Sequence, residues 1–130
     1  NINDKPVKSR IEYIIYQSLE RSGLKFKYEK ELELPKRPYN IHPDFTIELA
    51  NGKKIFWEHL GMLDTRKYYK DWQQRKKDYL DHGYFDQVIT TDDLNGINQE
   101  KIDALIDAIR ENNLKESSGN QFSNHHYELY

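Results

Sequence analysis

The sequence has no cysteine among its 130 residues. Disulfide bonds and thiolate metal sites are therefore excluded, and the absence fits a protein kept in a reducing compartment. The chain also has no apolar run near the roughly 20 residues that a membrane-spanning helix needs. The polar residues 1–5 do not have the pattern of a secretory signal. We expect a cytoplasmic protein, inside the cell, with no membrane partner.

The chain also lacks a strong excess of one charge, because 20 basic residues stand against 22 acidic ones and the formal net charge is −2. This balance gives no global sign of a nucleic-acid partner. A local basic surface is what attracts phosphate, however, so the charge must be considered segment by segment. The length fits one α/β domain, and we find no internal repeat.

The spacing of apolar residues predicts the order helix, three strands, helix, strand, helix. Helices are predicted over residues 6–23, 64–83 and 97–109, and strands over residues 24–34, 44–49, 55–57 and 87–91. We expect residues 1–112 to form the domain. Residues 113–130 are polar and without a period, and they are expected to form a tail or linker.

Two carboxylates flank a predicted hairpin. Asn51-Gly52 favours a type I′ turn, in which both residues take a positive φ. Folding at this turn brings Asp44, where one strand begins, beside Glu58, near the end of the next. Carboxylates this close repel each other, and a hard cation such as Mg²⁺ or Mn²⁺ relieves the repulsion. The alternative is a pair of surface charges, but Glu58 follows the apolar residues 55–57, where an unpaired carboxylate would be costly.

The two strings around these carboxylates, Pro43-Asp44-Phe45-Thr46-Ile47 and Trp57-Glu58-His59-Leu60-Gly61-Met62, resemble the PD-(D/E)xK, or restriction-endonuclease-like, nuclease superfamily. Further features resemble the branch that is appended to superfamily I helicases and related ATPases: Ser9-Arg10-Ile11-Glu12, Tyr28-Glu29, Tyr68, Trp72, Tyr79 and Gly83. The resemblance covers roughly residues 7–110. It implies an α/β fold with a restriction-endonuclease-like core, in which a mixed central sheet of about four strands is flanked by helices. It also implies an Mg-dependent DNA endonuclease within a larger helicase, DNA repair or defence protein.

One position departs from the family pattern, because Leu60 stands where the family name expects lysine. In this branch the lysine lies on the following helix, where the sequence offers Arg75, Lys76 and Lys77. Counting without gaps places Arg75 at the position, whereas we favour Lys76 as the functional lysine. Arginine would stabilise charge but stays protonated, which excludes it from deprotonating water. Alternatively, the basic run is a solvated helix face.

The resemblance also implies two additional metal ligands, namely Glu12 from the first helix and the backbone carbonyl of His59. For Glu12 the alternative is an exposed position on the helix. The basic residues of the second helix are expected to contact nucleic acid: Lys70, Arg75, Lys76 and Lys77. Trp72 is expected to lie in the core rather than to stack on bases. The histidines show no spacing typical of a zinc site.

Two functions therefore remain open. The first is a metal-dependent nuclease in which a metal-activated water attacks phosphorus. The second is a catalytically inactive nuclease fold that docks on DNA or on another protein, and Leu60 and Arg75 favour it. An unrelated structural domain would require every motif match to be chance.

Overall fold

A computed structural model describes residues 10–61, 65–93 and 97–117. Its elements, in chain order, are α1 (Arg10–Ser22), β1 (Lys25–Tyr28), β2 (Phe45–Glu48), β3 (Lys54–Leu60), α2 (Arg66–Asp81), the 3₁₀ helix η1 (Phe85–Gln87), β4 (Val88–Asp92) and α3 (Gln99–Ser117). The predicted α/β class, the element order and a four-stranded mixed sheet with three helices are confirmed. This architecture is compatible with a restriction-endonuclease-like core.

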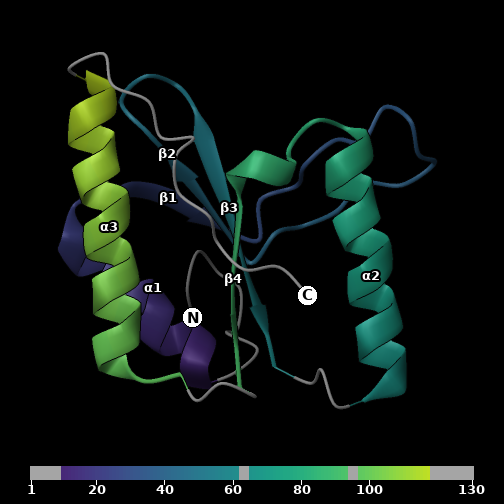
Figure 1. Cartoon of the computed structure of the whole chain (residues 1–130), viewed down its shortest axis with the longest axis horizontal. Helices are drawn as coiled ribbons and strands as arrows, with labels where there is room; N and C mark the ends of the chain where they lie inside the picture. The colour runs from purple at the N-terminus through teal and green to yellow at the C-terminus, as the bar shows by residue number, and fades with distance from the viewer. Residues whose placement is uncertain (1–9, 62–64, 94–96, 118–130) are drawn as a thin grey trace.

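The sheet has the strand order β1-β2-β3-β4 (Figure 1). β1 and β2 pair antiparallel, as do β2 and β3, whereas β3 and β4 are parallel because α2 carries the chain back across one face. The register pairs Phe45 with Trp57. Continuing it by one residue sets Asp44 opposite Glu58, as the hairpin pattern predicts.

The hairpin turn itself differs from the prediction. Gly52 has a φ of +87°, but Asn51 has no positive φ, so the predicted type I′ turn is wrong. The N–H of Gly52 donates to the carbonyl of Leu49 over 2.9 Å, and Lys53 N–H bonds the side chain of Asn51 at 2.9 Å. The turn therefore needs only one left-handed residue, and the glycine supplies it.

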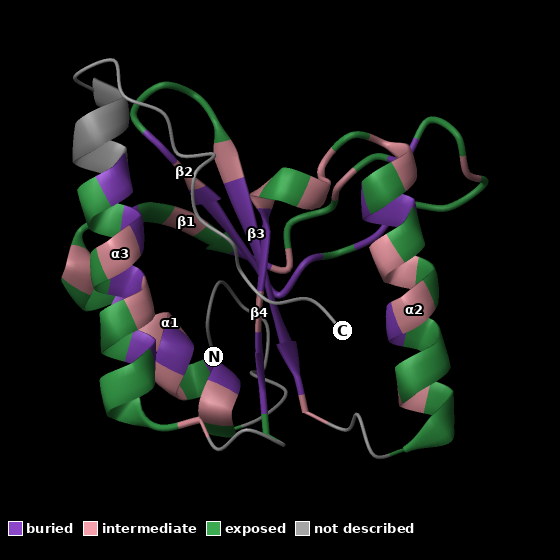
Figure 2. Ribbon diagram, viewed as in Figure 1, coloured by how far each residue is buried: buried purple, intermediate pink, exposed green. Residues whose placement is uncertain are grey.

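Two apolar cores cover the two faces of the sheet (Figure 2). On one face α1 and α3 pack against alternating strand residues that include Phe45, Ile47 and Trp57. On the other face α2 packs through Trp72 and Tyr79 against a second set: Leu34, Ile41, Phe56, Leu60 and Val88. The expectation that Trp72 is a core residue is confirmed, since its exposed fraction is 2%. Glu58 lies between Phe56 and Leu60 in alternation, so it faces α2.

The helix ends agree with the glycine signals, because Gly23 follows α1 with a φ of +80° and Gly83 follows α2 with a φ of +78°. The predicted start of the first helix, at residue 6, lies outside the described residues. α3 extends to Ser117, five residues past the expected end of the domain at residue 112. Residues 118–130, including the histidine pair at 125 and 126, also lie outside the described part. None of the described helices is long and apolar enough to span a membrane.

Candidate functional site

A cleft of about 640 Å³ opens at the edge of the sheet where β2 begins and β3 ends. Its lining includes three predicted site residues from separate segments: Glu12 of α1, Asp44 before β2 and Arg75 of α2. His59 of β3 also lines it, and the buried Glu58 lies directly behind Arg75, to which it is bonded. The structure therefore brings together residues that are far apart in the sequence.

Asp44 is buried at the cleft, with an exposed fraction of 7%. Its Oδ2 accepts a hydrogen bond of 2.7 Å from the backbone N–H of His59, which fixes the carboxylate against β3. Burial, and then the negative charges of Glu58 and Glu12, hold the pKa of Asp44 well above its ordinary value. A raised pKa means that the charged form of Asp44 is disfavoured here. A nearby cation would stabilise that charged form.

Glu58 is more deeply buried than Asp44, at 1% exposure. Its Oε1 accepts a hydrogen bond of 2.8 Å from the guanidinium of Arg75, and its Oε2 accepts one of 2.6 Å from the hydroxyl of Tyr79. Burial raises the pKa of Glu58, although the charge of Arg75 and the Tyr79 hydroxyl act in the opposite direction. Both oxygens of this predicted metal ligand are therefore already hydrogen-bonded.

Arg75 holds the position that the ungapped count gives for the lysine of the nuclease superfamily that the motif strings resemble. Burial is the largest influence and lowers the pKa of Arg75, but the charges of Glu58, Tyr79 and Asp44 and the hydrogen bond to Glu58 together outweigh it, so the pKa is raised. Lys76, which we favoured for this role, does not line the cleft in the described part of the chain. The helix phase explains the difference, because Arg75 follows Trp72 by three residues and precedes Tyr79 by four, and all three face the sheet.

Glu12 is buried rather than exposed, so the alternative of a surface helix position is wrong. Its Oε1 accepts a hydrogen bond of 2.9 Å from the hydroxyl of Tyr28 in β1. The sequence contained a usable signal for this contact, because a buried tyrosine hydroxyl needs a polar partner.

His59 contributes through its backbone and its side chain separately. Its N–H bonds Asp44, and its carbonyl accepts a hydrogen bond of 3.3 Å from the hydroxyl of Tyr68. The imidazole is bonded at both nitrogens, with Nδ1 2.8 Å from Oγ1 of Thr91 and Nε2 3.0 Å from Oδ1 of Asp93. The ring therefore anchors the end of β3 to β4 and the residue that follows it, a role that sequence reasoning missed.

The close approach of Asp93 favours a residue without a side chain at Gly61. A Cβ on residue 61 would lie 3.3 Å from Oδ2 of Asp93, closer than most Cβ contacts. The absent side chain leaves room for the carboxylate that holds the ring of His59.

The donors available for a metal are carboxylate oxygens of Asp44, Glu58 and Glu12 and the carbonyl oxygen of His59. Hard oxygen donors of this kind suit Mg²⁺, which uses one or two carboxylates and retains water ligands. Within the described residues, no group of three or more His, Cys, Asp or Glu side chains is placed to hold a metal ion. A two-carboxylate Mg²⁺ site therefore fits the chemistry of the residues, whereas a cage of several acidic side chains does not.

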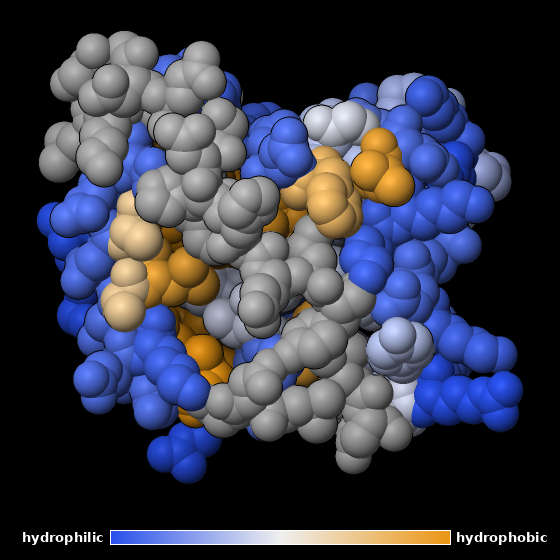
Figure 3. Space-filling view, viewed as in Figure 1, coloured by the Kyte–Doolittle hydropathy of each residue, from blue (hydrophilic) through white to orange (hydrophobic). Residues whose placement is uncertain are grey.

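The other predicted nucleic-acid contacts lie on α2. Lys70 and Lys77 are exposed, and Lys76 is half-buried. Hydrophilic residues cover the side of the molecule that α2 forms (Figure 3). This surface is not uniformly basic, because Lys67 is paired with Asp71 over 2.9 Å.

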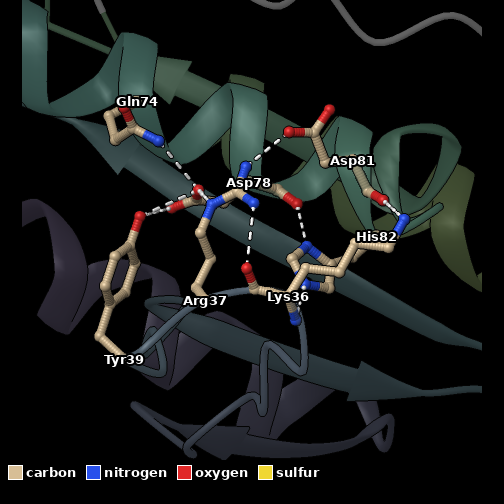
Figure 4. A network of polar contacts seen from close by, with 7 residues as sticks. All are labelled: Lys36, Arg37, Tyr39, Gln74, Asp78, Asp81 and His82. Atoms are coloured by element: carbon tan, nitrogen blue, oxygen red, sulfur yellow. Dashed lines mark hydrogen bonds and ion pairs between the residues drawn. The ribbon is translucent and has the colours of Figure 1, made fainter.

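A polar network joins the loop before β2 to α2 (Figure 4). Asp78 of α2 is buried and accepts hydrogen bonds from Arg37 Nε at 2.9 Å and from the hydroxyl of Tyr39. The N–H of Lys36 donates to the ring of His82 over 3.0 Å. The same loop continues into Asn40, Ile41 and His42, which line the cleft. One wall of the cleft is thus attached to the helix that carries Arg75.

Comparison with known proteins gives one relative. Over 95 residues the chain is 30% identical to "Uncharacterized protein MJ1519" of Methanocaldococcus jannaschii. The match covers 72% of this chain but only 8% of that protein, so the chain spans a small part of the relative's length. No protein-family model matches the chain. No solved structure matches it significantly.

Proposed function

We propose that this domain is a metal-dependent nuclease that hydrolyses phosphodiester bonds in DNA, with Asp44 and Glu58 as the ligands of Mg²⁺ or Mn²⁺. The observation that carries the proposal is the approach of three carboxylates: Asp44 and Glu12 line one cleft and Glu58 lies behind Arg75, and burial together with the charges of Glu58 and Glu12 raises the pKa of Asp44. Such an arrangement is costly for a metal-free protein. It is typical of sites built for a function rather than for stability.

The roles of the residues follow from their positions. Asp44 is oriented by the His59 N–H, and Glu58 by Tyr79, so both carboxylates are held before any ligand arrives. When bound, Mg²⁺ would polarise a phosphoryl oxygen and make water a stronger nucleophile at neutral pH. Arg75 carries the positive charge that neutralises the phosphate, and it stays protonated throughout.

The wider context is also part of this proposal. The relative is far longer than the matched segment, which supports a domain within a larger chain. We propose helicase or ATPase domains as its neighbours, in an intracellular protein, because the motif strings resemble that branch of nucleases. Two exposed lysines of α2, Lys70 and Lys77, would contact the phosphate backbone of DNA, which adds affinity without specifying a sequence.

A second candidate function is favoured by one specific observation. Both oxygens of Glu58 are engaged by protein donors, Arg75 and Tyr79, and Leu60 replaces the family's lysine. A domain whose second carboxylate serves only as a structural partner would dock on DNA or on another protein without cutting.

Cleavage of circular substrates separates these two functions. Circular single-stranded DNA and supercoiled plasmid would be incubated with Mg²⁺ or Mn²⁺ and with the wild-type domain, Asp44→Ala or Glu58→Ala, with Asp71→Ala as a matched control. Asp71 is an exposed carboxylate of α2 outside the cleft. We expect metal-dependent cutting by the wild type and the control only. Cutting that survives Asp44→Ala would exclude the proposed site, and DNA binding without cutting by the wild type would favour the docking module.

A further inference from the structure

Arg75 lies between the buried carboxylate of Glu58 and the cleft. The side chain of Glu58 is 1% exposed, whereas the side chain of Arg75, which bonds it, is 35% exposed and lines the cleft. Arg75 therefore separates the carboxylate of Glu58 from the cleft. Tyr79 approaches the other oxygen from within the second core and is itself buried.

A divalent cation and the guanidinium would compete for the same carboxylate. A carboxylate offers about four lone-pair sites, so the hydrogen bond from Tyr79 and a metal ligand bond can coexist on Glu58. Two positive charges cannot share the position of Arg75 without strong repulsion, because a buried site screens charge poorly. The guanidinium must therefore move when a metal binds Glu58.

We propose that Arg75 is exchanged between two partners, with the carboxylate of Glu58 in the metal-free protein and a DNA phosphate in the metal-bound one. This inference rests on the proposed function. The cleft is the open direction for the side chain, and a planar guanidinium that leaves a carboxylate is suited to a phosphate, which has the same paired-oxygen geometry. Tyr79 keeps the other oxygen of Glu58 in place during the exchange.

The exchange makes metal binding and DNA binding cooperative. A metal frees the guanidinium for phosphate, and by thermodynamic reciprocity DNA that holds the guanidinium frees Glu58 for the metal. Couplings of this kind usually change each affinity by about 5- to 150-fold. Without Arg75 the metal would bind more tightly on its own, and its effect on DNA affinity would fall to what its direct contact with the phosphate supplies.

The test uses Ca²⁺, a hard cation with oxygen ligands, as a probe that binds without promoting cleavage, which a gel would verify. Calorimetry gives the Ca²⁺ affinity, and fluorescence anisotropy of a labelled oligonucleotide gives the DNA affinity with and without Ca²⁺. The proteins are the wild type, Arg75→Gln, Asp44→Asn, and Arg110→Gln as a control. Arg110 lies on α3, on the opposite side of the sheet from α2, and its substitution removes the same charge (Figure 1).

We expect Ca²⁺ to tighten DNA binding at least about fivefold in the wild type and the control, and clearly less in Arg75→Gln, which should bind Ca²⁺ itself more tightly. Unchanged Ca²⁺ affinity in Arg75→Gln, with binding lost in Asp44→Asn, would overturn the exchange alone. Ca²⁺ binding that survives in Asp44→Asn would overturn the proposed metal site and the exchange with it.

A measurement on the wild type covers the case in which Arg75→Gln does not fold. The guanidinium nitrogen resonance of Arg75 should shift during a Ca²⁺ titration, with the same midpoint as metal binding by calorimetry. A resonance that stays constant at saturating Ca²⁺ would overturn the exchange.

Discussion

The hydroxyl of Tyr79 donates a hydrogen bond of 2.6 Å to Oε2 of Glu58, inside a core from which water is excluded. The same tyrosine ring stacks on Phe56 at a centroid distance of 5.9 Å. Tyr79 therefore serves the fold with its ring and the candidate site with its hydroxyl. The charge of Glu58 adds to burial in raising the pKa of Tyr79 well above its ordinary value, so the hydroxyl keeps its proton.

Tyr79→Phe should separate these two roles, because it removes only the oxygen. We expect a loss of about 1–3 kcal/mol in the free energy of unfolding at neutral pH, since Glu58 Oε2 would be buried without its donor. Tyr84→Phe is the matched control: its ring also contacts Phe56, and its hydroxyl bonds no described residue. Urea denaturation measures both variants. Equal losses in the two would show that the hydroxyl of Tyr79 contributes nothing specific.

Asp44→Asn should stabilise the metal-free protein at neutral pH. A carboxyl whose pKa is raised on folding stabilises the protein below its unfolded pKa, near 4, and that stabilisation is lost as the pH rises through the higher native pKa. Asparagine carries no charge and can still accept the N–H of His59. The stability of the variant relative to wild type should therefore increase from pH 4 to pH 7, as thermal denaturation would show. A difference that is constant with pH would contradict the raised pKa.

Thr91→Val should weaken the anchor at the end of β3. Oγ1 of Thr91 accepts a hydrogen bond of 3.1 Å from Trp57 Nε1 and lies 2.8 Å from His59 Nδ1, so valine leaves two buried nitrogens unpaired. We expect a loss of about 1–3 kcal/mol in the free energy of unfolding. In NMR spectra the indole N–H of Trp57 should shift while that of Trp72 stays in place.

Thr46→Val provides the control for this change. Thr46 is a buried strand threonine whose hydroxyl bonds no described side chain, so its loss should cost little. An indole resonance of Trp57 that does not move in Thr91→Val would contradict the hydrogen bond.

Most of the architecture could be predicted from the sequence, because apolar residues recur with a helical period in the helices and alternate in the strands. The number of residues on each side of the hairpin turn was also enough to predict that Asp44 lies opposite Glu58, even though the predicted turn type was wrong. The spacing from Trp72 and Tyr79 indicates that Arg75, and not Lys76, faces the sheet, although Lys76 was the residue favoured as the functional lysine.

Other features had no local signal. The ring of His59 bonds Thr91 and Asp93, 32 and 34 residues away, and such pairs follow from the parallel pairing of β3 and β4, not from a motif. The attachment of Arg37 to Asp78, 41 residues away, likewise depends on where α2 lies. Contacts of this kind could be expected only once the fold was known.

The attachment of the loop to α2 leads to the last prediction. Asp78 is 1% exposed and accepts hydrogen bonds from Arg37, Tyr39 and Gln74. Asp78→Ala removes the shared acceptor of these charge-assisted hydrogen bonds, although Arg37 keeps its ion pair with Asp81, and we expect a loss of about 1–3 kcal/mol in the free energy of unfolding. Hydrogen exchange should also become faster in α2 and in residues 36–41, but not in α3.

Asp71→Ala is the matched control on the same helix. Asp71 is exposed and, among the described residues, pairs with Lys67 alone, four residues earlier, a contact that contributes less than about 0.5 kcal/mol. If Asp78→Ala costs no more than Asp71→Ala, α2 is held by its apolar contacts with the sheet alone. If the larger loss is found, the polar network fixes the helix that presents both Arg75 and Tyr79 to Glu58, and the geometry of the candidate site depends on a loop that does not touch Glu58.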